Sequence, residues 1–174
     1  IWGCFSMDGR AQLYRWAGPY MTSRQVVAVN ADSGIETLAD LAGKTMMVQS
    51  TTKPEEIFLA GTDPRIPQLG ELLSTEDRSV QYAMLNCGYV DAIAAHETAI
   101  LQYMQDCNAD FRILEEPLLV TGIGVAFALN DTRGLDEQLT ETFAAMRADG
   151  TMKQIVGKYL PDPEKYLEVD ALEQ

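Results

Sequence analysis

The chain has 174 residues, enough for one sizeable core or for two small lobes. Its composition, 47% hydrophobic and 22% charged, is that of an ordinary globular protein and argues against disorder. The formal net charge of −13 repels phosphate backbones over most of the surface, which excludes nucleic acid as an expected partner.

The first elements predicted along the chain alternate between strand and helix. Residues 24–29 form an apolar, β-branched run typical of a buried strand. One helical turn is expected at 37–43, and a second strand at 44–49. Capping hydroxyls, a proline and two acids over 50–56 then predict a helix that ends near Gly61.

The middle of the chain continues the same alternation. Residues 62–74 show no clear period and are predicted as loop. Helices are expected at 77–87 and 97–105, with a short strand at 89–95 between them. The residues expected to face inward on these helices are Val80, Ala83, Met84, Cys87, Ile100, Leu101 and Met104. A β-α-β-α order with short connections predicts a parallel sheet with helices on its faces.

The last third predicts two strands followed by helices. The strands are expected at 111–114 and 118–129, and the second is too short and too interrupted to span a bilayer. An amphipathic helix is predicted at 134–149 and another at 151–159, where prolines end it. The acidic tail, 164–174, is expected to lie along the surface.

Cysteine and histidine usage gives no sign of a metal site or a cofactor. Cys4, Cys87 and Cys107 are widely spaced, and no CxxC motif is present. His96 is the only histidine. We expect buried free thiols, with one disulfide as the alternative. The chain begins with Ile1 and carries no signal sequence, which leaves its compartment open.

Several segments, in order, resemble the extracellular solute-binding proteins of polar amino-acid ABC transporters. The matching segments are Gly3–Arg10, Trp16–Tyr20, Leu38–Lys44, Val48–Thr52, Gly88–Ile93, Gly122–Ala126 and Arg147–Thr151, the last with Ile155, Lys158 and Tyr159. Each segment alone is a weak signal, but together they cover nearly the whole chain.

The resemblance implies an α/β, two-lobed periplasmic-binding-protein-like fold of type II with parallel-rich sheets. Residues 1–30 and 117–174 would form a partial lobe one, and residues 31–116 lobe two. Lobe one would be truncated, because the family normally begins it with a strand, a helix and a strand that this chain lacks. The missing part would come from the parent protein or from a second chain, or would have been cleaved.

On the lobe-one side, the resemblance implies ligand contacts from Phe5, Met7 and Arg10. Arg10 matches the arginine that clamps a ligand carboxylate, a task suited to the planar guanidinium fork. The alternative is a surface arginine paired with Asp8 or another acid. Met7 stands where the family usually has threonine, so one polar contact is expected to be lost or moved. Phe5 is the aromatic residue expected nearest the ligand, whereas Trp16 and Tyr20 are expected in the core.

On the lobe-two side, the resemblance implies contacts from Ser50, Thr51 and His96. Thr51 matches a hydroxyl and backbone N–H donor before a helix, or it is simply a helix cap. Ser50 stands where the family often has glycine. His96 replaces the aspartate that binds an α-amino group, and a neutral imidazole cannot serve as counter-charge, although Glu97 could move in. The alternative is a histidine satisfied by backbone groups.

The function implied is extracytoplasmic capture of a small polar ligand, an amino acid or a related carboxylate, by lobe closure. Delivery to an ABC transporter permease would follow, from the periplasm or from a cell-surface lipoprotein. One alternative is the ligand-sensing input domain of a membrane receptor kinase or cyclase. The remote alternative is an enzyme similar to cyclohexadienyl dehydratase, for which His96 and Glu97 would be the sole acid/base pair. No catalytic residue and no cofactor are otherwise expected.

Overall fold

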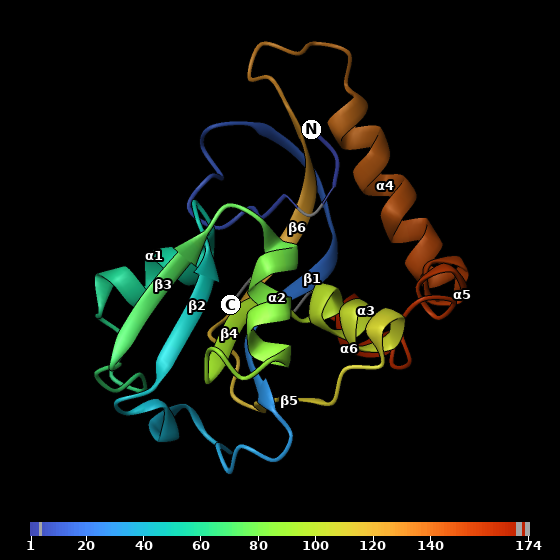
Figure 1. Cartoon of the computed structure of the whole chain (residues 1–174). Coiled ribbons are helices and arrows are strands. Elements are labelled where there is room, and N and C mark those ends of the chain that lie inside the picture. Colours follow the sequence, from blue (N-terminus) through green and yellow to red (C-terminus); the bar gives the residue numbers. More distant parts are fainter. Residues whose placement is uncertain (4, 170–171, 173–174) are drawn as a thin grey trace. The chain divides into compact units, whose positions relative to one another are not determined.

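The computed structural model describes residues 1–3, 5–169 and 172 (Figure 1). The chain divides into two compact units: unit 1 comprises residues 1–23 and 120–174, and unit 2 comprises residues 24–119. The elements, in chain order, are β1 (Arg15–Asn30), the short 3₁₀ helix η1 (Leu38–Leu41), β2 (Thr45–Gln49), α1 (Lys53–Ala60), β3 (Glu71–Thr75), α2 (Arg78–Asn86), β4 (Ala92–His96), α3 (Glu97–Cys107), β5 (Phe111–Ile113), β6 (Leu119–Phe127), α4 (Leu135–Ala148), α5 (Thr151–Val156) and α6 (Glu164–Leu167).

The sheet of unit 2 has the strand order β3-β2-β4-β1-β5 (Figure 1). Strand β2 pairs in parallel with β3 on one side and with β4 on the other. The second half of β1 runs antiparallel to both β4 and β5. The expected parallel arrangement is therefore confirmed for β2 and β4 and is wrong for β1, which runs antiparallel to β4. Strand β3, which was not expected, adds a further parallel strand, and β2, β3 and β4 are linked through α1 and α2.

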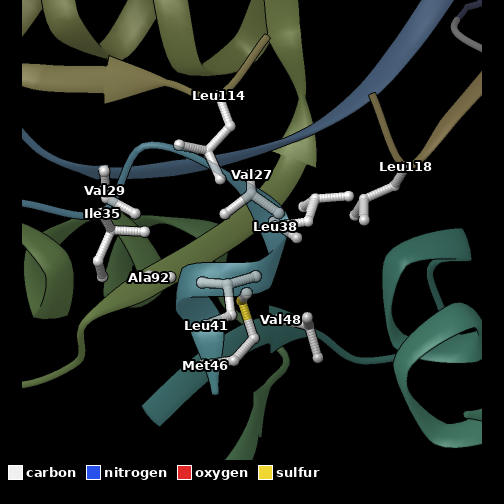
Figure 2. Close-up of a cluster of buried hydrophobic side chains, with 11 residues drawn as sticks. Val27, Val29, Ile35, Leu38, Leu41, Met46, Val48, Ala92, Leu114 and Leu118 are labelled. Atoms are coloured by element: carbon white, nitrogen blue, oxygen red, sulfur yellow. The ribbon is translucent and has the colours of Figure 1, made fainter. Parts of the chain in front are cut away.

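Both faces of this sheet are covered by apolar side chains. Successive residues of β1 alternate between two clusters, because neighbouring side chains of a strand point to opposite faces: Val27 and Val29 enter one cluster, Val26 and Ala28 the other. Figure 2 shows the first cluster, in which Leu38 and Leu41 of η1 lie with Met46 and Val48 of β2. Helices α2 and α3 contribute Tyr82, Leu85 and Ile100 to the second. This two-sided burial explains the continuous apolar run in the sequence.

Unit 1 is built around the pairing of β6 with β1. The N-terminal segment lies along β6, where the Met7 N–H donates to the Gly122 carbonyl at 3.0 Å and Ser6 forms a β-bridge with Ile123. Helices α4 and α5 close a smaller core whose buried members are Ala17, Val125, Phe143, Met152 and Val156. Tyr20 packs on this core, as expected.

The structure differs from the prediction in three places. Strand β1 is 16 residues long and begins at Arg15, well before the expected start at residue 24. Residues 71–75, predicted as loop, form strand β3. The strand is held by pairing with β2, which the local sequence pattern does not predict. In the tail, Tyr166 and Val169 are buried instead of lying on the surface.

The buried face of α2 also differs from the prediction. Gln81, Tyr82 and Leu85 are its buried residues, whereas Val80 and Cys87 are exposed. The Gln81 side chain is fully buried, and its Nε2 donates to the carbonyls of Met47 at 2.9 Å and Ala94 at 2.8 Å. A polar residue thus occupies the centre of the inward face, which the apolar pattern could not indicate.

The cysteines are not buried thiols where the structure describes them. Cys87 and Cys107 are free and exposed, so the expectation of burial is wrong for both. They are at the carboxyl ends of α2 and α3, where helix ends meet solvent. Cys4 lies outside the described residues. Over the described part of the chain, none of the helices has the length and apolar character required to cross a membrane.

Candidate functional site

In unit 1, Arg10 and Phe5 lie together. The Arg10 guanidinium carbon is 5.0 Å from the centroid of the Phe5 ring, and Arg10 Nη1 donates to the Ser6 carbonyl at 3.3 Å. Phe5 stacks in turn on Trp16, with ring centroids 5.4 Å apart. Arg10 is in none of the ion pairs found among the described residues, and its role as a carboxylate clamp stays a prediction. The guanidinium therefore keeps donors available for an anion.

Met7 packs against strand β6. A Cβ atom placed on Gly124 would lie only 3.0 Å from Met7 Sδ and 2.9 Å from the Ala17 carbonyl oxygen. Glycine at position 124 is thus required for the close approach of these segments. Next to Met7, the Ser6 hydroxyl lies 3.0 Å from that of Thr121 in a buried pair. The polar ligand contact expected to be lost or moved at Met7 stays a prediction.

In unit 2, the expected site residues lie at one edge of the sheet. Strands β2, β3 and β4 are parallel, so their carboxyl ends share that edge, and α1, α2 and α3 begin directly beyond it. The Ser50 N–H donates to the Thr75 carbonyl at 2.8 Å, which ties the end of β2 to the end of β3. This edge of an open α/β sheet is the usual position for a ligand.

Thr51 is exposed and has a left-handed backbone, with φ of 61°. A β-branched residue rarely adopts this conformation, and such strain concentrates at functional sites. Thr52, not Thr51, is at the N-cap position of α1, but its side chain makes no capping hydrogen bond, and its hydroxyl donates to the Gln49 carbonyl at 2.6 Å. Thr51 is left as a donor just before the helix start.

A carboxylate already occupies the backbone donor of Thr51. The Thr51 N–H donates to Glu55 Oε2 at 2.6 Å, and the Ser74 hydroxyl donates to Glu55 Oε1 at 2.5 Å. The hydroxyl of Ser74 and the N–H of Thr51 lower the pKa of Glu55. The same donors suit a ligand carboxylate, with which Glu55 would have to exchange.

His96 faces a glutamine from the neighbouring strand. Gln25 of β1 is opposite His96 in register, and its Nε2 lies 3.1 Å from Nδ1 and 3.2 Å from Nε2 of the imidazole. Burial, followed by the charge of Arg78, lowers the pKa of His96 from 6.5. His96 is therefore neutral at physiological pH and can both donate and accept one hydrogen bond. Its side chain contacts that of Gln25, and its role in binding a ligand stays a prediction.

Sequence reasoning missed three residues of this edge: Gln25, Gln49 and Arg78. Arg78 Nε donates to Gln49 Oε1 at 3.1 Å, which holds the guanidinium over the end of β2. A signal for Gln25 was present, since a polar residue opening an otherwise apolar strand needs a partner. No signal was available for Arg78, because its place depends on β3.

Glu97, the residue expected to be able to substitute for the missing aspartate, forms an ion pair in this structure. It is 5% exposed, and its Oε2 lies 3.3 Å from Arg24 Nε. Moving it toward a ligand would leave Arg24 without this partner.

The residues predicted to bind ligand are divided between the two units. Phe5, Met7 and Arg10 lie in unit 1, and Ser50, Thr51 and His96 lie in unit 2. The described residues contain no group of three or more side chains able to hold a metal ion.

Comparisons with known proteins show which sequences are similar to this chain. The histidine-binding periplasmic protein of Salmonella typhimurium is 33% identical over 145 residues, which are 79% of this chain and 54% of that protein. The glutamate-binding protein GluB of Corynebacterium glutamicum is 26% identical over 170 residues, 92% of this chain and 55% of that protein. The chain thus spans about half the length of these curated relatives.

Solved structures are similar as well. The substrate-binding protein of an amino acid ABC transporter superposes with a TM-score of 0.70 at 28% identity, covering 89% of this chain and 67% of that one. A Streptococcus pneumoniae ABC uptake transporter substrate-binding protein with bound histidine has a TM-score of 0.78 at 22% identity, covering 94% and 68%, and supports the fold. The fold is therefore the α/β, periplasmic-binding-protein-like fold of type II. Since the family model for bacterial extracellular solute-binding proteins, family 3, matches residues 1–162, the chain belongs to that family.

Proposed function

We propose that this chain captures a small carboxylate ligand outside the cytoplasm, an amino acid or a related acid, for delivery to an ABC transporter permease. Support comes from the family, which is extracellular, and from relatives named as histidine-binding and glutamate-binding. The two units would act as the lobes, as partial lobe one and lobe two. The ligand would be bound and released unchanged.

The proposal rests chiefly on the contacts that the Arg10 side chain makes. Its guanidinium lies over an aromatic ring and donates to one backbone carbonyl, which leaves further N–H groups for two carboxylate oxygens. In unit 2, the exposed Thr51 precedes the amino end of α1, which favours the same kind of group. A ligand that contacts both units would favour the closed arrangement, because only in that arrangement can it bind to both units at once.

Calorimetry with the full-length protein and a panel of amino acids and small organic acids tests the proposal. Arg10→Ala should raise the Kd of the best ligand about 100-fold, roughly 3 kcal/mol, as expected when one partner of a charge-assisted pair is removed. Arg133→Ala is the matched control, since Arg133 is an exposed arginine paired with Asp131 in the same unit. Its affinity should match that of the unmodified protein. Unchanged affinity in Arg10→Ala would remove Arg10 from the site.

Closure is tested separately by small-angle X-ray scattering. The radius of gyration of the full-length protein should fall when the ligand saturates it, and Arg10→Ala should need correspondingly more ligand for the same change. A radius that stays constant at saturation would contradict capture by closure.

A further inference from the structure

The side chain of Gln25, in unit 2, has a buried acceptor without a hydrogen-bond partner. Gln25 is 3% exposed, and its Oε1 meets no donor among the described residues. Two other polar groups of this residue are engaged: Nε2 lies 3.1 Å from His96 Nδ1, and the carbonyl accepts the Leu118 N–H at 2.8 Å. A buried amide oxygen without a donor is costly, and such groups are found where a ligand or water completes the site.

Gln25 lies at the same edge of the sheet as the loop before α1. Strand β1 runs antiparallel to β4, so Gln25 is opposite His96 at the carboxyl end of β4. Because side chains alternate along a strand, Gln25 points to the face that carries Val27 and the cluster of Figure 2. Helix α1 packs on this face through Ile57, and Thr51 precedes the helix. The unpartnered oxygen therefore belongs to the edge where the ligand is proposed to bind.

The guanidinium of Arg78 is attached to the opposite face of the sheet. In β2, Met47 points into the second cluster, and Gln49, two residues further on, points to the same side. Arg78 Nε donates to Gln49 Oε1 at 3.1 Å, and Tyr82 of the same helix packs in the second cluster. Arg78 is therefore held by a side chain on the face away from Gln25.

The positive charge of Arg78 is also offset at this edge. Glu55 and Asp77 keep their negative charge, because hydrogen bonds from serine hydroxyls, and then from backbone N–H groups, lower the pKa of both. Lys53, at the start of α1, pairs with Glu56 at 3.1 Å. The charges at this edge therefore do not exclude an ammonium group.

An amide oxygen accepts hydrogen bonds and cannot donate them, so it pairs with an ammonium and not with a carbonyl or carboxylate oxygen. We propose that Gln25 Oε1 accepts a hydrogen bond from the α-ammonium of the ligand and makes this chain prefer amino acids to acids that lack this group. A neutral amide on β1 would thus supply the acceptor that the resemblance expects from an aspartate in place of His96. This inference rests on the proposed function, capture of a small carboxylate, and narrows its ligand to amino acids.

The test uses pairs of acids that differ at the α-carbon: L-glutamate with 2-oxoglutarate, L-alanine with pyruvate, and L-histidine with imidazole-4-propionate. The second member of each pair has no donor on that carbon. Calorimetry on the full-length protein should show the amino acid of the best pair binding at least about 10-fold more tightly than its partner.

Two variants assign this preference to the oxygen of Gln25. Gln25→Met keeps the length of the side chain but removes the amide, so the amino acid should weaken about 10-fold and its partner by less than about 2-fold. Gln25→Glu keeps an oxygen and adds a negative charge, so the amino acid should keep or increase its advantage. The control is Gln102→Met, at an exposed position of α3 in the same unit, which should change neither affinity.

Carbon-13 NMR of the Gln25 side-chain carbonyl adds a measurement on the unmodified protein that does not depend on the folding of a variant. Its resonance should shift further when the amino acid saturates the protein than when the partner acid does, because only the former donates to Oε1. An equal shift, equal affinity for both members, or equal weakening of both by Gln25→Met would overturn the inference and leave the proposed function intact. If no member of any pair binds, both the inference and the proposed function are wrong.

Discussion

His96 is the single histidine of the chain, and its titration is therefore a direct probe of one site. Burial and the charge of Arg78 lower its pKa below 6.5 in the folded protein. The unfolded chain thus takes up this proton at a higher pH than the folded one. The stability that neutral His96 contributes is complete above the unfolded pKa and is lost as the pH falls below it toward the folded pKa.

We expect the free energy of unfolding, measured with urea, to decrease between about pH 7.5 and about pH 5.5, and His96→Gln to flatten this slope. NMR of the imidazole should give a pKa below 6.5, and Arg78→Gln should raise it. An imidazole pKa at or above 6.5 in the unmodified protein would mean that neither burial nor Arg78 acts on the ring.

Residue-level prediction succeeded where the determinants are local and failed where they are distant. The helix at Lys53 follows from the hydroxyls, proline and acids around its start, all within a few residues. The partners of His96 do not follow in this way: Gln25 is 71 positions away in the sequence, and only the β1–β4 register brings it to the ring. The roles assigned to Arg10 and Thr51 by resemblance stay predictions.

At the scale of elements, helix α2 is fixed to the sheet of unit 2 by one buried amide. Gln81 donates to a carbonyl of β2 and to a carbonyl of β4, so a single side chain joins the helix to two neighbouring strands. The apolar contribution of α2 comes from Tyr82 and Leu85. The arrangement explains how a helix with so few apolar residues on its buried face is held in register.

Gln81→Ala should lower the free energy of unfolding by about 3 kcal/mol, through two lost hydrogen bonds and the cavity left behind. Gln81→Met keeps most of the volume and should cost about 1 kcal/mol, the smaller loss that hydrogen bonds alone account for. The control is Gln102→Ala on α3, whose amide donates to Asp106 at the exposed surface. Urea unfolding measures all three, and equal losses in Gln81→Ala and Gln102→Ala would contradict the anchoring role.

The sequence did not predict strand β3 or the buried face of α2. Only Leu72 and Leu73 are apolar in β3, and both are partly buried, so the strand exists because β2 offers an edge to pair with. The buried face of α2 depends on carbonyls of strands distant in the sequence. By contrast, the continuous apolar run at Val26–Val29 correctly predicted a buried strand. A strand in a sheet that is covered on both faces needs apolar side chains on both sides.

At the scale of the whole molecule, the two units differ in how much apolar surface they bury. Unit 2 has a cluster on each face of its sheet, and Val26, Val27, Ala28 and Val29 are all 0% exposed. The described residues of unit 1 form one core cluster, in which Phe143, Met152 and Val156 each keep 6% to 7% of their surface exposed. Because burial of apolar area is the main source of stability, unit 1 should open at a lower free energy than unit 2.

Native-state hydrogen exchange on the full chain tests this difference. Amides at Val26–Val29, Met46–Val48 and Ile93 should exchange slowest, whereas those of α4 and α5 should exchange at least about 10-fold faster, equivalent to about 1.4 kcal/mol of opening free energy. Small additions of urea should accelerate exchange in α4 and α5 before they affect β2 and β4, because sub-global opening of unit 1 exposes less surface than global unfolding. If all these amides share one opening free energy and one urea dependence, the units do not unfold separately, and the continuous strand β1 couples them into one cooperative structure.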